Sequence, residues 1–262
     1  MTSADRSLFA ASFQHAGVAA AYAHRPPYPP AVFDLLTSLV VGSPRVVLDL
    51  GAGEGALARP LASLVDRVDA LEISAAMVAA GRARSGGDLP VWHVTAVESQ
   101  SLDGPFGLAT AGASLHWMDW PRTFAVLGRV LAPGAVLAVV EQSYHRLPWQ
   151  EALVPVIARY SRNQAYDRGF SLPAELARQG HWEIIGRHDT PPTPFVQDVA
   201  AYIEQFHSTS SLAREIMPAD EARAFDAAIE GLVRDHVLPD GTLSLPTIAT
   251  VVWGRPVRPG PE

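Results

Sequence analysis

A glycine-rich loop and one downstream carboxylate are the residues whose types and spacing could bind a ligand. Gly51, Gly53 and Gly55 lie in the run LDLGAGEG, at the end of an apolar segment. Glycines permit positive φ angles and let a ligand approach the backbone, and a helix that follows offers free amides to an anionic group. Glu72 lies 21 residues after Gly51, where a carboxylate can accept hydrogen bonds from both hydroxyls of a ribose. The pattern predicts a cofactor site.

Alternating strands and helices would place these residues at one edge of a sheet. Apolar runs predict buried parallel strands at residues 46–50, 67–73, 90–96, 106–112 and 135–141. Helical periodicity marks the segments between them, with Ser74 and Asp119 as N-caps. Strands that alternate with helices across short turns form right-handed βαβ units. We therefore expect a doubly wound sheet that binds its ligand beyond the carboxyl ends of the strands.

The segments on either side of this core are mostly helical. Residues 7–23 and 31–40 predict two N-terminal helices, while residues 182–189 and 243–253 predict two late strands. We expect a single domain over residues 1–262. It would consist of N-terminal helices (1–42), a cofactor-binding core (43–141), a helical cap (142–180 and 197–240) and the last strands (181–196 and 241–254).

Composition excludes several chemistries. The chain has 262 residues, of which 48% are hydrophobic and 18% charged, as is typical of a globular protein. Cysteine and lysine are both absent, which excludes thiolate-bound metals, lysine Schiff bases and a P-loop. The net charge is −7, no basic patch occurs, and no segment is long and apolar enough to span a bilayer. We expect a cytoplasmic protein with no metal site and with neither nucleic acid nor a membrane as partner, since no targeting segment is recognisable.

Several motifs resemble those of the class I S-adenosylmethionine-dependent methyltransferases. The spacing G-x-G-x-G in LDLGAGEG is similar to motif I of that family, whereas nicotinamide enzymes use G-x-G-x-x-G. VDALEIS resembles the next motif, and residues 114–141 resemble the block from the fourth strand to the fifth. YAHRPPYP, FHSTSSLAREIM and TVVWGRP resemble elements of the methyltransferase type 11 and trans-aconitate methyltransferase group. The resemblance implies an α/β, Rossmann-like doubly wound fold with seven strands, mostly parallel with an antiparallel last strand, plus a helical cap.

The resemblance also implies which residues face the cofactor, S-adenosylmethionine. Glu72 would hold the ribose, Ile73 would flank the adenine, and Asp49 would lie toward the amino acid part. Tyr22 and Arg25 match an N-terminal element that closes over the methionine moiety. The implied cofactor-binding set is Tyr22, Arg25, Asp49, Gly51, Ala52, Gly53, Glu72, Ile73, Met77, Ala96, Val97 and Ala113.

The chain departs from the family pattern at two positions. Ala96 replaces the acid that commonly accepts a hydrogen bond from the adenine amino group, so a backbone carbonyl or a water would have to serve. Gly107 replaces the aspartate that usually follows phenylalanine at the start of the fourth strand. The first departure concerns how adenine is held, and the second has no consequence that the sequence reveals.

Methyl transfer needs a base only where the acceptor must lose a proton. His116, just after the fourth strand, is the first candidate, and His207 in the late helical segment is the second. Either histidine could instead be a packing residue that forms a hydrogen bond near the pocket. Aromatic residues that could line a substrate pocket, or could equally form the core of the cap, are Trp117, Trp149, Tyr202 and Phe206.

The leading interpretation is an enzyme that transfers a methyl group from S-adenosylmethionine to a small-molecule acceptor, leaving S-adenosylhomocysteine. Secondary metabolism or a small organic acid is the expected context. A first alternative is an enzyme of natural-product biosynthesis on the same fold that binds the cofactor but catalyses a cyclisation or pericyclic step. A second alternative is a non-enzymatic cofactor-binding protein. The expected assembly is a monomer or a homodimer.

Overall fold

The computed structural model describes residues 12–163 and 169–257, and the chain divides into two compact units. The sheet unit comprises Tyr28–Gln142, Gly169–Pro191 and Ala249–Glu262. The helical unit comprises Met1–Pro27, Ser143–Arg168 and Pro192–Ile248. The chain therefore passes repeatedly between the units, and each unit is described by itself below.

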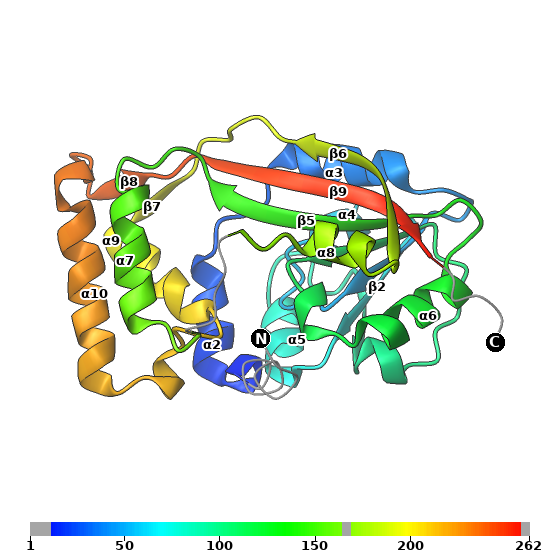
Figure 1. The fold of residues 1–262 in the computed structure, drawn as a ribbon, viewed down its shortest axis with the longest axis horizontal. Coiled ribbons are helices and arrows are strands. Elements are labelled where there is room, and N and C mark those ends of the chain that lie inside the picture. The colour runs from blue at the N-terminus through cyan, green and yellow to red at the C-terminus, as the bar shows by residue number, and fades with distance from the viewer. Residues whose placement is uncertain (1–11, 164–168, 258–262) are drawn as a thin grey trace. The chain divides into compact units, whose positions relative to one another are not determined.

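Seven strands form one sheet with the order β3-β2-β1-β4-β5-β9-β6 (Figure 1). The neighbours from β3 to β5 pair in parallel, whereas β9 is antiparallel to β6. This confirms the mostly parallel, doubly wound seven-stranded sheet. The strands are β1 Val46–Leu50, β2 Arg67–Glu72, β3 Val91–Val94, β4 Leu108–Gly112, β5 Leu137–Tyr144, β6 Trp182–Asp189 and β9 Thr247–Pro256.

Helices cover both faces of this sheet. Two of them are capped as the sequence predicts, because Ser74 accepts from the amide of Met77 and Asp119 accepts from the amide of Arg122. The helices are α3 Pro30–Leu39, α4 Ala58–Ala62, α5 Ala75–Arg82, α6 Trp120–Val130 and α8 Leu172–Arg178, with short 3-10 helices at Val97–Ser99 and Leu115–Trp117.

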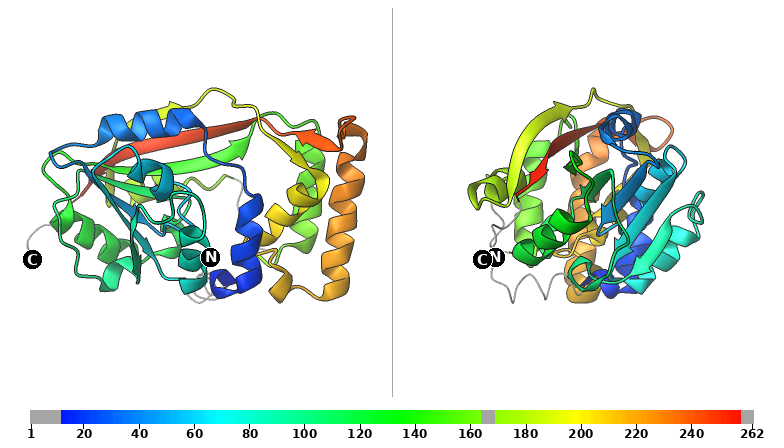
Figure 2. Two further views of the ribbon diagram at one scale, coloured as in Figure 1. Left: turned by 180° about the vertical axis from the view of Figure 1, so that it is seen from behind. Right: turned by 90° about the vertical axis from the view of Figure 1, so that its right-hand side faces the viewer.

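Alternation along the strands gives the sheet two separate apolar cores. Val47 of β1 packs with residues of α3 and α4, while its neighbour Leu48 packs with residues of α6 and α8. In Figure 1 the helices α6 and α8 are nearer the viewer, and in the reversed view of Figure 2 α3 is nearer. Because both faces are buried, every residue of β1 is buried, as expected for a central parallel strand.

The helical unit has its own core and a small second sheet. The core contains Trp149, Tyr202 and Phe225. Among the described residues of both units, no helix is long and apolar enough to cross a membrane. The helices are α2 Ala16–Ala21, α7 Gln150–Tyr160, α9 Val199–Glu204 and α10 Ala219–Val233, with short 3-10 helices at Ser12–Gln14, Tyr22–His24, Gln205–Ser208, Arg214–Ile216 and Arg234–His236. The strands β7 Val196–Asp198 and β8 Thr242–Ser244 pair antiparallel.

The sequence prediction differs from the structure at both ends of the chain. The expected helix 7–23 is broken into short pieces, and its first residues lie outside the described part. The expected strand 243–253 is two strands, β8 and β9, separated at Leu245 and Pro246. Proline cannot donate to a strand ladder, and three-residue strands are too short to show a period-two pattern. The small β7–β8 sheet was therefore missed.

Gly107 acquires a structural reason that the sequence did not reveal. Its amide donates to the carbonyl oxygen of Val46, and its own carbonyl oxygen accepts from the amide of Val41. A Cβ atom at position 107 would lie 2.0 Å from the carbonyl oxygen of Val41. The segment before β1 thus packs directly against the backbone that enters β4, and any side chain there would push the two apart.

Candidate functional site

The loop after β1 depends on glycine at the carboxyl edge of the sheet. Gly51 and Gly53 have φ angles of 62° and 58°, in the left-handed region that residues with a Cβ disfavour. A Cβ on Gly51 would also lie 2.7 Å from the Cβ of Ser114. The loop is fixed from β2 as well, because the amide of Ala52 donates to the carbonyl oxygen of Leu71 over 2.8 Å.

Glu72 ends β2 beside this loop and is only 8% exposed. Its Oε2 accepts from the amide of Gly53 over 2.8 Å, and its Oε1 accepts from the amide of Ser74 over 2.9 Å. Burial raises the pKa of the carboxyl, and the bonds from Ser74 and Gly53 oppose that rise. One carboxylate therefore joins the glycine loop to the start of α5.

Asp49 lies in β1 just before the loop and is 1% exposed. Its Oδ1 accepts from the hydroxyl of Thr110 on β4 over 2.7 Å. Burial is the main cause that raises its pKa to about 7, and the charge of Glu72 adds to the rise, while bonds from Thr110 and the amide of Ala58 oppose it. The site thus contains two buried carboxyls, and the charge of Glu72 disfavours ionisation of Asp49.

The remaining predicted residues of this edge differ in what they expose. Ile73 is 47% exposed directly after buried Glu72, so it presents an apolar surface at the end of β2. Met77 and Val97 are 1% and 3% exposed, so their side chains lie beneath the surface that a ligand would contact. Ala96 is partly exposed and is followed by a short 3-10 helix whose first amides have no partner within that helix.

The acid nearest to Ala96 in sequence is committed elsewhere. Glu98 accepts from the amide of Asp119 and from the hydroxyl of Thr123 through its Oε1, both over 2.9 Å. These contacts tie the 3-10 helix to the start of α6. Glu98 therefore does not take the place of the acid that the family pattern has at position 96.

The end of β4 approaches the glycine loop. Ala113 has a φ of 54°, an unusual value for a residue with a Cβ, and is exposed. The hydroxyl of Ser114 donates to the carbonyl oxygen of Leu50 over 2.5 Å. The Cβ of Ser114 lies so close to Gly51 that a side chain on Gly51 would clash with it. Ser114 and Thr110 could not be predicted from the sequence, because a serine and a threonine near strand ends carry no distinctive pattern.

His116 follows in the 3-10 helix Leu115–Trp117 of the same unit. It is partly buried, and its ring lies 4.4 Å from that of Trp117 between centroids. Burial lowers its pKa to about 4. The imidazole is therefore neutral at pH 7, which leaves it free to accept a proton but makes it a weak base.

The predicted residues Tyr22 and Arg25 lie in the helical unit. The guanidinium of Arg25 lies 4.0 Å from the centroid of the Tyr22 ring. Its Nε donates to the hydroxyl of Ser208 over 2.6 Å, and its Nη2 donates to the carbonyl oxygen of Ser208 over 3.2 Å. The N-terminal element thus contacts the late helical element, although 183 residues separate them in the sequence.

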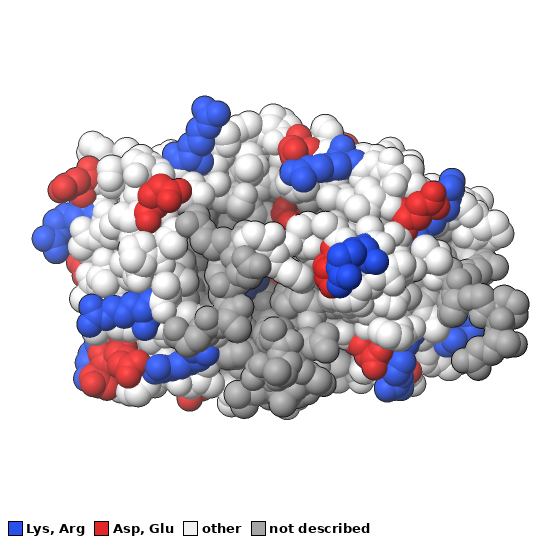
Figure 3. Space-filling view, in the orientation of Figure 1, with Lys and Arg blue, Asp and Glu red and all other residues white. Residues whose placement is uncertain are grey.

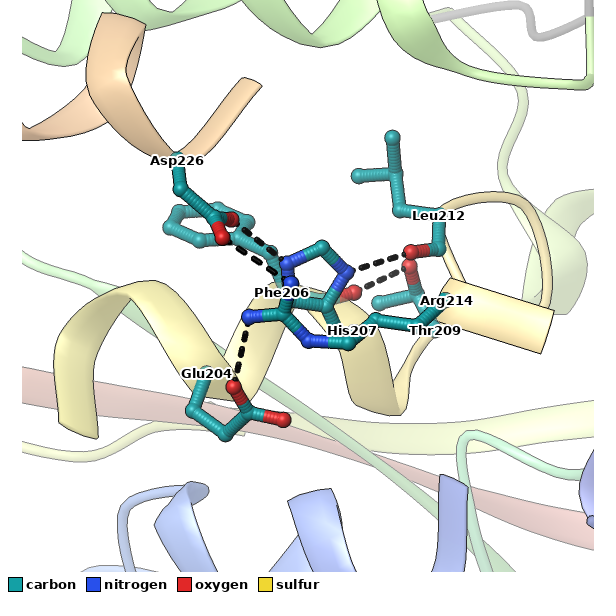
Figure 4. A network of polar contacts seen from close by, with 7 residues as sticks. All are labelled: Glu204, Phe206, His207, Thr209, Leu212, Arg214 and Asp226. Carbon is teal, nitrogen blue, oxygen red and sulfur yellow. Dashed lines mark hydrogen bonds and ion pairs between the residues drawn. The ribbon is translucent and has the colours of Figure 1, made fainter. Parts of the chain in front are cut away.

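His207 belongs to a network of charges in the helical unit (Figure 4). It is 2% exposed, and its Nδ1 and Nε2 lie 2.7 Å from the carbonyl oxygen of Leu212 and 2.8 Å from Oδ1 of Asp226. Both partners are acceptors, so a ring nitrogen that carries a proton can donate to the acceptor that it faces. Arg214 bridges Asp226 and Glu204 over 2.9 and 2.8 Å. These bonds give His207 a structural role, and its assignment as a base stays a prediction.

Three predicted substrate residues also lie in the helical unit. Trp149 and Tyr202 are 4% and 0% exposed, and the indole nitrogen donates to the tyrosine hydroxyl over 2.9 Å. The Phe206 ring packs edge-on against that of Tyr202. These contacts are those of a hydrophobic core, while Trp117, the fourth residue, is partly buried in the sheet unit. Their role toward a substrate stays a prediction.

Arginine side chains on the face drawn in Figure 3 are scattered, and several adjoin acidic ones. Pairs of this kind include Arg178 with Glu175 and Arg187 with Asp189, whose N···O distances are 2.5 and 3.1 Å. Pairing reduces the local positive potential that would attract a polyanion. Among the described residues, no group of three or more histidine or acidic side chains is placed to hold a metal ion.

Comparison with known proteins agrees with this geometry. Residues 47–134, which contain the glycine loop and Glu72, match the family described as methyltransferase domain. An uncharacterized methyltransferase of Mycobacterium tuberculosis is 32% identical over 108 residues, which is 40% of this chain and 55% of that protein. A second one from the same organism is 32% identical over 136 residues, which is 52% of this chain and 54% of that protein. The chain thus spans about half the length of the curated relatives that it matches.

Solved structures share the fold at lower identity. A protein from Anaeromyxobacter dehalogenans, described as a candidate type II methyltransferase, has a TM-score of 0.58 and 20% identity, covering 90% of this chain and 99% of that one. A SAM-dependent methyltransferase from Thiobacillus denitrificans in complex with S-adenosylhomocysteine has a TM-score of 0.50 and 16% identity, covering 88% and 93%. The match of residues 47–134 to the methyltransferase-domain family, together with these relatives and structures, confirms the resemblance to class I S-adenosylmethionine-dependent methyltransferases.

Asp49→Asn should stabilise the protein at alkaline but not at acid pH. The pKa of Asp49 in the folded protein is about 7, above the ordinary 3.8. The folded protein therefore binds the proton more tightly than the unfolded chain does, and ionisation of Asp49 opposes folding. The stabilising contribution of the protonated carboxyl is present below pH 3.8 and is lost as the pH rises through 7. Asparagine stays neutral, so the free energy of unfolding should rise by about 2–4 kcal/mol at pH 8 and hardly change at pH 4.

Chemical unfolding of Asp49→Asn at pH 4 and pH 8 measures this difference. Asp88→Asn, at an exposed position of the same unit, is the matched control and should change stability little at either pH. Equal effects of Asp49→Asn at both pH values would show that Asp49 is ionised at no cost in the folded protein.

Proposed function

We propose that the protein is an S-adenosylmethionine-dependent methyltransferase that acts on a small-molecule acceptor. The observation that carries the proposal is the position of Glu72, a buried carboxylate bonded to the glycine loop within the methyltransferase domain. The related protein from Thiobacillus denitrificans is a complex with S-adenosylhomocysteine, which supports the same cofactor here.

The residues at this edge of the sheet suit the parts of that cofactor. A carboxylate has about four acceptor positions. The amides of Gly53 and Ser74 each donate to one oxygen of Glu72, and the backbone of Ile73 adds a further hydrogen bond. The capacity that these amides leave can accept from hydroxyl groups of the ribose. Exposed Ile73 supplies an apolar surface for the adenine ring. Because Ala96 has no polar side chain, the adenine edge would be held by backbone groups at residues 96–98.

Asp49 suits the positively charged end of the cofactor. Its carboxyl is buried beneath the glycine loop and has a pKa raised to about 7, so a nearby cation would favour its ionised form.

Arg25, the proposed partner of the methionine carboxylate, has its Nε and Nη2 occupied by Ser208. The guanidinium has five N–H donors, so donors remain for an anionic group.

The bound cofactor would supply an activated methyl group on a sulfonium, and the protein would mainly supply position. In-line displacement requires the acceptor to be held in line with the bond that breaks. The described residues contribute a rigid strand-end platform, because Glu72, Asp49 and Ser114 are each buried and bonded to the loop or to a neighbouring strand. Trp117 and His116, which follow Ser114 in the 3-10 helix Leu115–Trp117, are the candidates in this unit for contacts with the acceptor.

A small-molecule acceptor fits the charge distribution better than a nucleic acid does. The net charge is −7, and arginines on the face in Figure 3 lie among acidic side chains. A nucleic-acid surface would instead gather arginines along one groove. Secondary metabolism or a small organic acid remains the proposed context, with S-adenosylhomocysteine as the second product.

A second candidate function is an enzyme that binds S-adenosylmethionine without transferring its methyl group. The observation that favours it is the pKa of about 4 at His116, because so weak a base deprotonates a hydroxyl or amine poorly. Such an enzyme would retain the Glu72 site and use the cofactor as a scaffold for a cyclisation or pericyclic step.

Incubation with methyl-labelled S-adenosylmethionine and a panel of small organic acids, phenols and amines distinguishes the two functions. A methyltransferase should transfer the label to one class of acceptor and form an equal amount of S-adenosylhomocysteine. Tight cofactor binding with no label transfer across the panel would favour the non-methylating enzyme. Lack of any cofactor binding would contradict both.

Glu72→Ala should weaken S-adenosylhomocysteine binding by about tenfold to a hundredfold for each ribose hydrogen bond that it removes. The substitution removes the acceptor for both ribose hydroxyls, and each hydrogen bond to a charged group contributes about 1.5–3 kcal/mol. Calorimetry on folded protein provides the dissociation constant. Glu183→Ala, which removes an exposed acid from β6, should bind as the wild type does. An unchanged constant for Glu72→Ala would place the ribose elsewhere.

If His116 is the base for an acceptor that must lose a proton, His116→Ala should lower turnover by about 10²-fold. This is the low end of the 10²–10⁴-fold that a positioned base contributes, because the lowered pKa of His116 makes it a weak base. Binding of S-adenosylhomocysteine should stay within about twofold of wild type. Since the pKa of His116 is about 4, its protonation should not reduce the rate between pH 6 and 8. His188→Ala, on exposed β6, is the control. Near-normal turnover of His116→Ala would assign His116 to packing.

A further inference from the structure

A cluster of three charged side chains lies behind the glycine loop, apart from the residues proposed to touch the cofactor. Its members are Glu54 of the loop, Arg59 of α4 and Arg84, two residues after the end of α5. Glu54 is 6% exposed. Arg84 Nη2 lies 2.5 Å from Oε2 of Glu54, and Arg59 Nη2 lies 3.9 Å from its Oε1.

The arginines also hold the backbone of the loop and of the turn after α5. The Nε of Arg59 donates to the carbonyl oxygen of Glu54 over 3.0 Å. Its Nη1 donates to the carbonyl oxygen of Ser85 over 3.1 Å, next to Arg84. Arg59 therefore bridges the glycine loop and the turn at residues 83–87 after α5. The ion pair between Glu54 and Arg84 joins the same two segments. The cluster connects the loop, α4 and the turn after α5.

Close packing makes this arrangement sensitive to small displacements. A Cβ on Gly81 of α5 would lie 2.7 Å from the carbonyl oxygen of Glu54, so helix and loop are already at the closest approach that glycine allows. A Cβ on Gly55 would lie 2.7 Å from the ring of Trp92, and the indole nitrogen of Trp92 donates to the carbonyl oxygen of Gly87. Movement of the turn after α5 would therefore move the loop.

Stability alone does not explain a buried carboxylate at position 54. Burying charges costs several kcal/mol per ion, and well-packed apolar residues often stabilise a fold as well as a buried ion pair does. Burial lowers the pKa of Arg59, while the charge of Glu54 opposes that change. Ionic contacts differ from apolar ones in fixing direction and register, because guanidinium donors have a defined geometry.

The loop needs such fixing because its conformation is entropically costly. Gly51, Gly53 and Gly55 all adopt left-handed φ angles, and glycine loses more conformational freedom on ordering than other residues do. Glu72 holds the loop beside the start of α5, where it also accepts from Ser74. The cluster holds the loop beside the end of the same helix.

We propose that Glu54, Arg59 and Arg84 form a clamp that holds the glycine loop in its cofactor-binding conformation, which makes Arg84 a positioning residue for S-adenosylmethionine. The inference rests on the proposed function for the identity of the ligand. The clamp acts through the amide of Gly53 and the carboxylate of Glu72, since a displaced loop would release that hydrogen bond and leave the ribose acceptor misplaced.

Arg84→Met and Glu54→Gln, singly and together, test the clamp in the full-length protein. Each single variant should weaken S-adenosylhomocysteine binding by about fivefold to thirtyfold, the effect of losing one ion pair between contacting side chains. The double variant should bind no more weakly than the weaker-binding single variant, because both substitutions remove the same ion pair. Arg84→Lys should restore part of the affinity. Arg82→Gln removes an equal charge from an exposed position of α5 and is the control.

Hydrogen exchange of ligand-free protein supplies a readout that does not depend on the cofactor. Amides 52–57 should exchange faster in Arg84→Met than in wild type, while β1 and β4 and the Arg82→Gln control should be unchanged. Unaltered loop exchange together with unaltered affinity of the folded variants would overturn the clamp. A wild-type protein that does not bind S-adenosylhomocysteine would instead refute the proposed function, and loop exchange would still decide whether the clamp exists.

Discussion

The paired hydrogen bonds of Glu72 are the interaction on which the site depends. One buried carboxylate accepts from the amide of Gly53 in the glycine loop and from the amide of Ser74 at the start of α5. The strand–loop–helix unit of β1 and the next unit of β2 are therefore held in register at the carboxyl edge of the sheet. A carboxylate suits this position because it accepts several donors at once and concentrates negative charge where hydroxyl groups of a ligand can donate.

Burial of acidic groups gives this edge an electrostatic character that a cationic ligand would relieve. Asp49 and Glu72 both have pKa values raised by burial, and the charge of Glu72 contributes to the rise at Asp49. An apo protein with two such carboxyls carries unfavourable self-energy near the glycine loop. A ligand with a sulfonium and an ammonium group would offset that cost, which connects the thermodynamics of the folded chain to the proposed cofactor.

The helical unit is organised by polar contacts between segments that are distant in the sequence. Arg25 near the N-terminus donates to Ser208, and His207 beside it is bonded to Asp226 of α10. Arg214 extends this network to Glu204. Such bonds fix the late helical element against both the N-terminal element and α10, since each buried donor has few alternative acceptors. The aromatic residues of this unit, including Tyr202 and Trp149, form its core.

The sequence by itself determined that the sheet is doubly wound and mostly parallel. It also determined the glycine loop, the caps at Ser74 and Asp119, and the position of Glu72 at the end of a strand. These features follow from local periodicity and from residue types with few conformational alternatives. Tertiary structure decided what depends on distant contacts. It buried Met77 and Val97, committed Glu98 to α6, and explained Gly107 by the backbone of Val41. It also brought Arg84 to Glu54 across 30 residues. Pairwise side-chain geometry of this kind leaves no periodic trace, so only the folded chain reveals it.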